Sequence, residues 1–236
     1  MKLLRPGLVP YGQALAWQLE LRRRLQEGIA DDAVGYLMCL EHPPVVTLGK
    51  RGTVDDIFGL QALRDRGAQF FKIDRGGEAT YHGPGQLVIY PIVKLEALGL
   101  GVVDVIRGLA TCLADTLLAY DVTAEYDSDH PGLWTVDTPI RRKIASVGMR
   151  LSGGVSTHGA AVNLVNDLTP FSFFVPCGMP DSSMARLADL SDREEIDVDE
   201  FTDRFLESFA DFLDQPLEML EATPPPEEDW VAPMTL

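Results

Sequence analysis

The sequence is poor in cysteine and has no long apolar run. It contains three cysteines in 236 residues, and a small odd number argues against a disulfide framework. It also has no stretch that approaches the roughly 18 consecutive apolar residues of a membrane-spanning helix. The first residues lack the pattern of a secretory signal. We therefore predict a cytoplasmic protein with no membrane partner, in which a thiol can stay reduced.

Basic residues are scarce in the last third of the chain. Residues 151–236 hold three Lys and Arg against 18 Asp and Glu, and the whole chain carries a net charge of −16. Such acidity makes a nucleic-acid partner a poor hypothesis. Basic clusters occur only earlier, at residues 22–24, 50–51 and 141–143. We expect that an acidic protein partner docks on one of them, and residues 141–142 are our first choice.

Hydrophobic periodicity predicts a single domain of the α+β class. Helical spacing covers residues 11–28, 102–121 and 198–213, and shorter β-branched or aromatic runs between them predict strands. Gly153 and Gly154 predict a hairpin turn between two of these strands. We expect a mixed, largely antiparallel sheet flanked by helices over residues 1–215. The acidic, proline-rich residues 216–236 are expected to form a disordered or loosely held tail.

A glycine-rich segment, "RGGEATYHGPGQ", covers residues 75–86 between two predicted strands. Its four glycines permit positive φ angles and let a ligand approach the backbone, and successive N–H groups can bind an anion. The segment lacks the Gly-Lys-Ser/Thr ending of a P-loop. A long hairpin made of turn residues is the structural alternative.

A second segment, residues 141–164, carries residues that can do chemistry. Lys143 begins a predicted half-buried strand, and His158 precedes the small residues Gly159, Ala160 and Ala161. A solvated lysine on an edge strand is the structural alternative for Lys143. Small residues beside a histidine leave room for a ligand against the backbone.

The third segment is "FFVPCGMPD", residues 173–181, which places Cys177 among turn residues. Cys39 and Cys112 lie in apolar periodic runs and are predicted to be core residues. A nucleophilic cysteine needs a nearby positive charge or base. Lys143, His82 and His158 are candidates, and the sequence leaves the choice open. A zinc site made of Cys177, His82 and His158 is a weaker alternative because no pair has short ligand spacing.

Together these segments resemble the lipoyl(octanoyl) transferase family. The resemblance rests on "EHPPVVTLGKRG", "RGGEATYHGPGQLVIYP", "KIASVGMR", "THGAAVNL" and "FVPCGM", which follow in the family's order. It implies the fold of the catalytic domain of biotin and lipoate protein ligases. It implies that Cys177 is the nucleophile and that Lys143 activates the thiol and moves protons. It implies substrate contacts at Arg75, Gly76, Gly77, Glu78, Ala79, Thr80, Tyr81, His82, Ser146, Val147, Gly148, Gly159, Ala160 and Ala161.

The resemblance also implies the reaction and the partners. The octanoyl group would pass from octanoyl-acyl carrier protein, through a Cys177 thioester, to a lysine of the lipoyl domains of 2-oxoacid dehydrogenases and of the glycine cleavage H protein. No cofactor and no metal are expected. An ATP-dependent lipoate or biotin ligase of the same fold is the main alternative. A papain-like cysteine hydrolase, for which no Asn or Asp partner is identified, and a non-enzymatic acyl-binding module also remain open.

Overall fold

The strands form two sheets. The computed structural model describes all residues except 30–32, 137, 175–183 and 222. In this part of the chain an eight-stranded sheet has the order β11-β1-β2-β6-β10-β9-β8-β7, and a three-stranded sheet has the order β4-β3-β5. The strands of the large sheet are β1 (Lys2–Leu8), β2 (Gly35–Glu41), β6 (Gln86–Val93), β7 (Ala124–Asp127), β8 (Gly132–Thr135), β9 (Lys143–Ser152), β10 (Val155–Asn163) and β11 (Glu218–Met219). Those of the small sheet are β3 (Val45–Leu48), β4 (Gln69–Lys72) and β5 (Ala79–His82).

The large sheet is mixed and mainly antiparallel, which confirms the predicted fold class. Only the pairings of β1 with β2 and with β11 are parallel among its described strands. The predicted hairpin between β9 and β10 is also present. Gly153 and Gly154 both have positive φ, which favours glycine and suits a two-residue hairpin turn.

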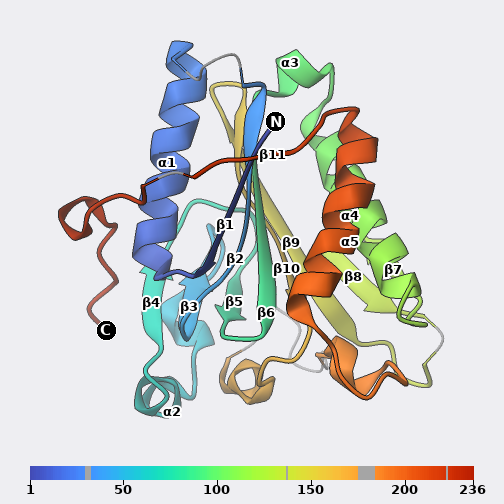
Figure 1. The fold of residues 1–236 in the computed structure, drawn as a ribbon. Coiled ribbons are helices and arrows are strands. Elements are labelled where there is room, and N and C mark those ends of the chain that lie inside the picture. The colour runs from blue at the N-terminus through green and yellow to red at the C-terminus, as the bar shows by residue number, and fades with distance from the viewer. Residues whose placement is uncertain (30–32, 137, 175–183, 222) are drawn as a thin grey trace.

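Helices cover both faces of the large sheet (Figure 1). Helix α1 (Tyr11–Glu27) packs on one face, and α4 (Val102–Leu118) with α5 (Val198–Leu213) packs on the other. Helix α1 ends as predicted, because Gly28 adopts the left-handed conformation that ends helices. Asp197 caps the start of helix α5, because its carboxylate accepts hydrogen bonds from the backbone N–H groups of the first turn. Short helices α2 (Leu60–Asp65) and α3 (Leu95–Leu98) complete the fold.

One predicted loop is partly wrong. Residues 79–82, inside the glycine-rich segment, form strand β5, which pairs antiparallel with β3. Ala79 and Tyr81 point into the core of the small sheet with Phe171. All four side chains of β5 are buried and point alternately to its two faces, which stabilises this strand despite the surrounding glycines.

The C-terminal segment is docked on the fold, so of the two forms expected for this tail the disordered one is wrong for its described residues. The N–H of Glu218 donates to Met1 O (2.9 Å), and Leu220 N–H donates to Leu3 O (2.8 Å). Further on, Val231 N–H donates to Gly12 O and Met234 N–H to Phe70 O. The segment therefore crosses α1 and ties the edge of the large sheet to the small one (Figure 1).

Removing residues 224–236 is expected to destabilise the protein. Val231 packs beside Tyr11, and Met234 and Leu236 pack on the core of the small sheet. Loss of this partly buried apolar surface should lower the melting temperature by about 5–10 °C. Thermal unfolding followed by circular dichroism measures the effect. Glu228→Gln, at an exposed position of the same segment, is the control; equal melting temperatures for all three proteins would contradict this docking.

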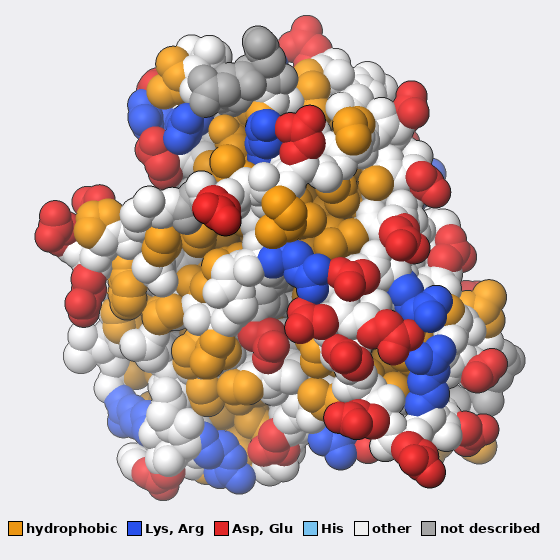
Figure 2. Space-filling view, viewed as in Figure 1, with side chains coloured by type: hydrophobic (Ala, Val, Ile, Leu, Met, Phe, Trp, Pro, Cys, Tyr) orange, Lys and Arg blue, Asp and Glu red, His pale blue; other side chains and the backbone are white. Residues whose placement is uncertain are grey.

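The outer face over α5 is strongly acidic (Figure 2). Arg5 pairs with Asp199 and Asp203, while Glu200 pairs with Arg193 and Arg204. This face therefore does not suit an acidic partner.

Within the described residues, no helix is long and apolar enough to span a bilayer.

Candidate active site

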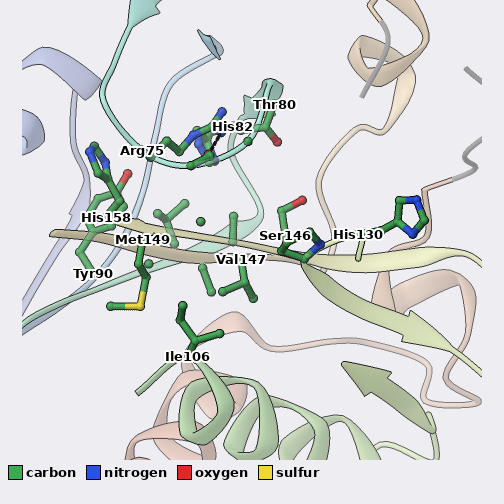
Figure 3. Close-up of a pocket in the computed structure, with 18 of the residues that line it drawn as sticks. Arg75, Thr80, His82, Tyr90, Ile106, His130, Ser146, Val147, Met149 and His158 are labelled. Carbon is green, nitrogen blue, oxygen red and sulfur yellow. Dashed lines mark hydrogen bonds between the residues drawn. The ribbon is translucent and has the colours of Figure 1, made fainter. Parts of the chain in front are cut away.

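A cavity of about 260 Å³ lies between the β9–β10 hairpin, the segment before β5 and helix α4 (Figure 3). Eleven of the fourteen predicted substrate contacts line it, and they come from three separate segments. They are Arg75, Gly76, Gly77, Thr80, His82, Ser146, Val147, Gly148, Gly159, Ala160 and Ala161. The fold thus brings residues 75–82 of the glycine-rich segment together with residues 146–148 and 159–161.

Three of the predicted contacts do not line this cavity. Ala79 and Tyr81 alternate with Thr80 and His82 along β5, so their side chains face the opposite side. Glu78 lies at the edge, where its carboxylate is 3.5 Å from Arg51 Nε. The alternation of a strand therefore divides the glycine-rich segment into cavity residues and core residues.

Arg75 holds the glycine-rich segment in shape. Its guanidinium is buried and donates hydrogen bonds to the carbonyls of Thr47, Gly76 and Glu78, at 2.9–3.0 Å, and to Thr47 Oγ1. Five N–H donors in a rigid fork suit such a task. Arg75 therefore shapes the backbone of the cavity wall as well as adding positive charge to it.

Glycines let the two walls of the cavity approach closely. Gly148 on β9 is the register partner of Gly159 on β10. A Cβ on Gly159 would lie 2.1 Å from Ile89 O, and one on Gly148 would lie 3.4 Å from Gly76 O. Any side chain at Gly159 would therefore clash with the backbone of β6. The absence of a side chain at Gly148 lets the backbone of Gly76 lie close to β9.

Sequence reasoning missed several lining residues from distant elements. They are Tyr11 on α1, Tyr90 on β6, Ile106 on α4, and Tyr126, His130 and Met149 from β7 to β9. Ile106 lies within the helix predicted over residues 102–121, where an apolar residue at helical spacing is typical of a core. Periodicity marks such residues as inward-facing but cannot distinguish a filled core from a cavity wall.

Lys143 is buried beside the cavity, although it is not among the described residues that line it. Its Nζ lies 5.5 Å from the centroid of the Trp134 ring. Trp134 pairs with Lys143 while Leu133 pairs with Ala145, so Ile144 is an extra residue in β9. Such bulges re-aim side chains, often next to active sites. The structural alternative of a solvated edge lysine is therefore wrong.

Gly132 leaves space for this lysine. A Cβ on Gly132 would lie 2.4 Å from Lys143 Cε and 2.2 Å from Ala145 O. Only glycine therefore accommodates the lysine side chain in this arrangement.

Cys177 lies outside the described residues. The chain before it is anchored where Phe174 pairs with Ile57, and the chain after it returns at Met184, which pairs with Lys143. Ala185 N–H also donates to Lys143 O (2.9 Å). The other two cysteines, Cys39 and Cys112, are buried in the core as predicted. Burial raises the pKa of Cys39 to about 12.

Three buried histidines lie around the cavity. His42 Nδ1–H donates to Val9 O (2.7 Å), and the Tyr90 hydroxyl donates to His42 Nε2 (2.9 Å). His158 Nε2–H donates to Asp74 (3.1 Å). Burial lowers the pKa of His42 to about 4 and that of His82 to about 3. Burial also lowers the pKa of His158, with Asp74 opposing the shift.

Mild acid is expected to destabilise the fold. A histidine with a lowered pKa stays neutral when folded but takes up a proton near pH 6.5 when unfolded. Its contribution is complete above that pH and is lost as the pH falls toward the folded value. For His42 and His82 the loss from pH 7.5 to 5 is about 2 kcal/mol each.

Urea unfolding across this pH range measures that loss. A His42→Gln variant should show a shallower dependence, by about one proton. A free energy of unfolding that does not change between pH 7.5 and 5 would contradict the neutral state of these histidines.

The described residues hold no group of three or more His, Cys, Asp or Glu side chains arranged to bind a metal ion. His158 is instead paired with Asp74, and His82 with Gln86. One ring nitrogen of each of these two histidines is therefore already engaged in a hydrogen bond within the fold.

Proteins with similar sequences include octanoyltransferases. A family model described as "Lipoyl protein ligase A/B catalytic domain" matches residues 10–210. An octanoyltransferase of Solibacter usitatus is 39% identical over 211 residues, covering 88% of this chain and 90% of the relative. An octanoyltransferase of Chloroflexus aggregans is 40% identical over 184 residues, covering 77% and 81%.

Solved structures share the fold. A putative lipoate protein ligase from T. acidophilum with bound lipoic acid has a TM-score of 0.73 at 18% identity, covering 97% of this chain and 90% of that one. A lipoate-protein ligase A bound with ATP has a TM-score of 0.71 at 16% identity, with the same coverage. At these identities the likeness concerns the fold alone.

Proposed function

Because this chain belongs to the octanoyltransferases of the lipoyl protein ligase A/B catalytic domain family, we propose that it transfers the octanoyl group through a thioester on Cys177. The chain is an acyltransferase that moves an octanoyl group for protein lipoylation. The proposal adds the donor, octanoyl-acyl carrier protein, and the acceptor, a lysine of a lipoyl domain. Lipoyl domains of 2-oxoacid dehydrogenases and the glycine cleavage H protein are the acceptors considered.

One observation carries the thioester route. The chain that follows Cys177 re-enters the described structure paired with Lys143, whose side chain is buried under Trp134. An ammonium about 4 Å from a sulfur contributes up to about 4 kcal/mol at an effective dielectric constant of 20. Lys143 in that position would favour the thiolate, which is the reactive form of the nucleophile.

The two steps balance without a further reactant. In the first, the Cys177 thiolate attacks the donor thioester, a C–S bond to Cys177 forms, the donor's own C–S bond breaks, and the departing carrier thiolate takes a proton from the Lys143 ammonium. In the second, the acceptor amine attacks the Cys177 thioester, a C–N bond forms and the C–S bond breaks. The amine proton goes to the neutral Lys143, so that its ammonium and the Cys177 thiolate are both restored. Neither ATP, a cofactor nor a metal takes part.

The octanoyl chain would occupy the cavity. Its apolar walls at Val147, Ile106 and Met149 suit a hydrocarbon (Figure 3). The glycines on β9 and β10 leave space for the octanoyl chain beside the sheet. We assign roles at the substrate site to the fourteen predicted residues, with direct contact limited to those that line the cavity. The eleven that line the cavity would touch the acyl group or its thioester, and Glu78, Ala79 and Tyr81 would support them.

The carrier protein would dock near the cavity, within residues 1–215, which we propose as the catalytic domain. Arg51 lines the cavity and is 69% exposed, with the Glu78 carboxylate 3.5 Å away, whereas Arg141 is 49% exposed, pairs more closely with Asp127 (2.8 Å) and lies over Trp134. Neighbouring Lys50 is also exposed. The cluster at residues 50–51 therefore suits an acidic carrier better than residues 141–142, our first choice from the sequence.

A transfer assay with and without ATP tests this function. We expect octanoyl-carrier protein to octanoylate a lipoyl domain without ATP, and octanoate with ATP to give no product. Product formed only from octanoate and ATP would identify a ligase instead. Mass spectrometry of the lipoyl domain measures both reactions.

A further inference from the structure

The two ring nitrogens of His82 have different surroundings. The ring lines the cavity and is more than nine-tenths buried. Nδ1 lies 2.7 Å from Gln86 Oε1. In the described part of the chain, no residue forms a hydrogen bond with Nε2. One nitrogen is therefore held by the fold, and the other is available to a molecule in the cavity.

A chain of hydrogen bonds determines which nitrogen carries the proton. Asn163 Nδ2–H donates to the carbonyl of Ala185 (3.0 Å), so Asn163 Oδ1 is left to accept from Gln86 Nε2–H (2.9 Å). Gln86 Nε2–H also donates to the carbonyl of Tyr81 (3.2 Å). Backbone carbonyls only accept, so both amide orientations are fixed. Gln86 Oε1 must then accept from His82 Nδ1–H, and Nε2 carries a lone pair.

The ring is held neutral and in place. Burial lowers the pKa of His82 to about 3, so both the charge and the tautomer are settled at neutral pH. The Tyr11 ring stacks on His82 with centroids 6.2 Å apart, and His42 meets its edge at 5.7 Å. The cavity therefore contains a fixed, buried hydrogen-bond acceptor. It cannot donate a hydrogen bond to a thioester carbonyl.

A chain of hydrogen bonds links the His82 ring to the backbone of Lys143. The hydrogen bonds run from His82 through Gln86 and Asn163 to Ala185, whose own N–H donates to Lys143 O. Ser146 and Ala161, register partners near this end of β9 and β10, line the same cavity. A saturated acyl chain and its thioester contain no hydrogen-bond donor. The acyl chain and its thioester therefore supply no partner for Nε2, whereas the acceptor's amine does, and an amide of the carrier's arm is the competing donor.

We propose that His82 Nε2 accepts a hydrogen bond from the acceptor lysine's amino group as that nitrogen attacks the acyl-enzyme. This rests on the proposed function. A neutral amine has one lone pair for the thioester carbon and N–H groups that need acceptors in a desolvated site. His82 holds one N–H and so orients the lone pair, while the departing proton goes to Lys143. The contact belongs to the second step only, because the first step has a thiolate nucleophile without an N–H.

The test compares two nucleophiles on one acyl-enzyme. Octanoyl-enzyme is prepared from wild type and His82→Phe, then mixed with either a lipoyl domain or the free carrier thiol. We expect His82→Phe to slow transfer to the lysine about tenfold, the loss of one buried hydrogen bond, and to change return to the thiol less than about threefold. His82→Gln, whose oxygen can accept in a similar place, should restore amine transfer to within about threefold of wild type.

Other results would overturn the proposal. Equal slowing with both nucleophiles would mean that His82 acts on the thioester or on the fold. Slower formation of the octanoyl-enzyme with normal amine transfer would mean that His82 binds an amide of the carrier's arm. Unchanged rates in His82→Phe would remove the contact. Absence of any octanoyl-enzyme in wild type would instead refute the thioester route, and the role of His82 with it.

Discussion

Replacing Cys177 with alanine is expected to abolish octanoyl transfer. The variant lacks the sulfur that forms the thioester, and no other thiol is placed to substitute for it. Loss of a covalent nucleophile should reduce turnover at least about 10³-fold. Turnover is measured as octanoylated lipoyl domain formed from octanoyl-carrier protein.

The other two cysteines supply matched controls. Cys39 and Cys112 are buried, so Cys39→Ala and Cys112→Ala remove a small apolar group from the core. These variants should unfold at lower urea concentration yet keep turnover. Full activity in Cys177→Ala, or loss of activity confined to a core cysteine, would refute the assignment of the nucleophile.

Replacing Lys143 with methionine is expected to lower turnover by roughly 10²-fold or more, the usual range for losing a general acid–base. Methionine fills similar space without charge, so the fold should survive, as it often does when a buried charge is replaced by an apolar side chain. Without the ammonium, the pKa of the Cys177 thiol should rise. The pH dependence of iodoacetamide labelling, measured beside turnover, reports this change.

Two further variants sharpen this prediction. Lys143→Arg keeps a positive charge but should still lose most turnover, because guanidinium does not give up its proton and Gly132 leaves little space beside Cε. Lys94→Met, at an exposed lysine, should behave as wild type. If the labelling profile of Lys143→Met overlays that of wild type, the activator is another group, and His158 would be examined next.

Local signals in the sequence predicted the elements that local forces determine. Gly28 ended α1, and the glycine pair at 153–154 closed the β9–β10 hairpin, because positive φ at these positions is a property of the residues themselves. The docking of residues 216–236 could not be predicted in this way. The pairing of Glu218 with Lys2 joins positions 216 residues apart, and no local pattern encodes such a contact.

The residues of the site also divide into those that the sequence predicts and those that only the folded structure reveals. Arg75, Lys143 and the small residues on β10 stood out because their types are unusual in their segments. Tyr11 and Tyr90 did not, because an aromatic residue in an apolar helix or strand is typical of a core. The acceptor role of His82 depends on two amide orientations fixed by backbone carbonyls, and only the folded arrangement reveals it.

The most direct test of the covalent mechanism is the intact mass of the protein after incubation with octanoyl-carrier protein without ATP. A single octanoyl adduct is expected, mapped by peptide analysis to Cys177, absent from Cys177→Ala and discharged by a lipoyl domain. No adduct, an adduct on Cys39 or Cys112, or an adduct that forms only with ATP would contradict the thioester route.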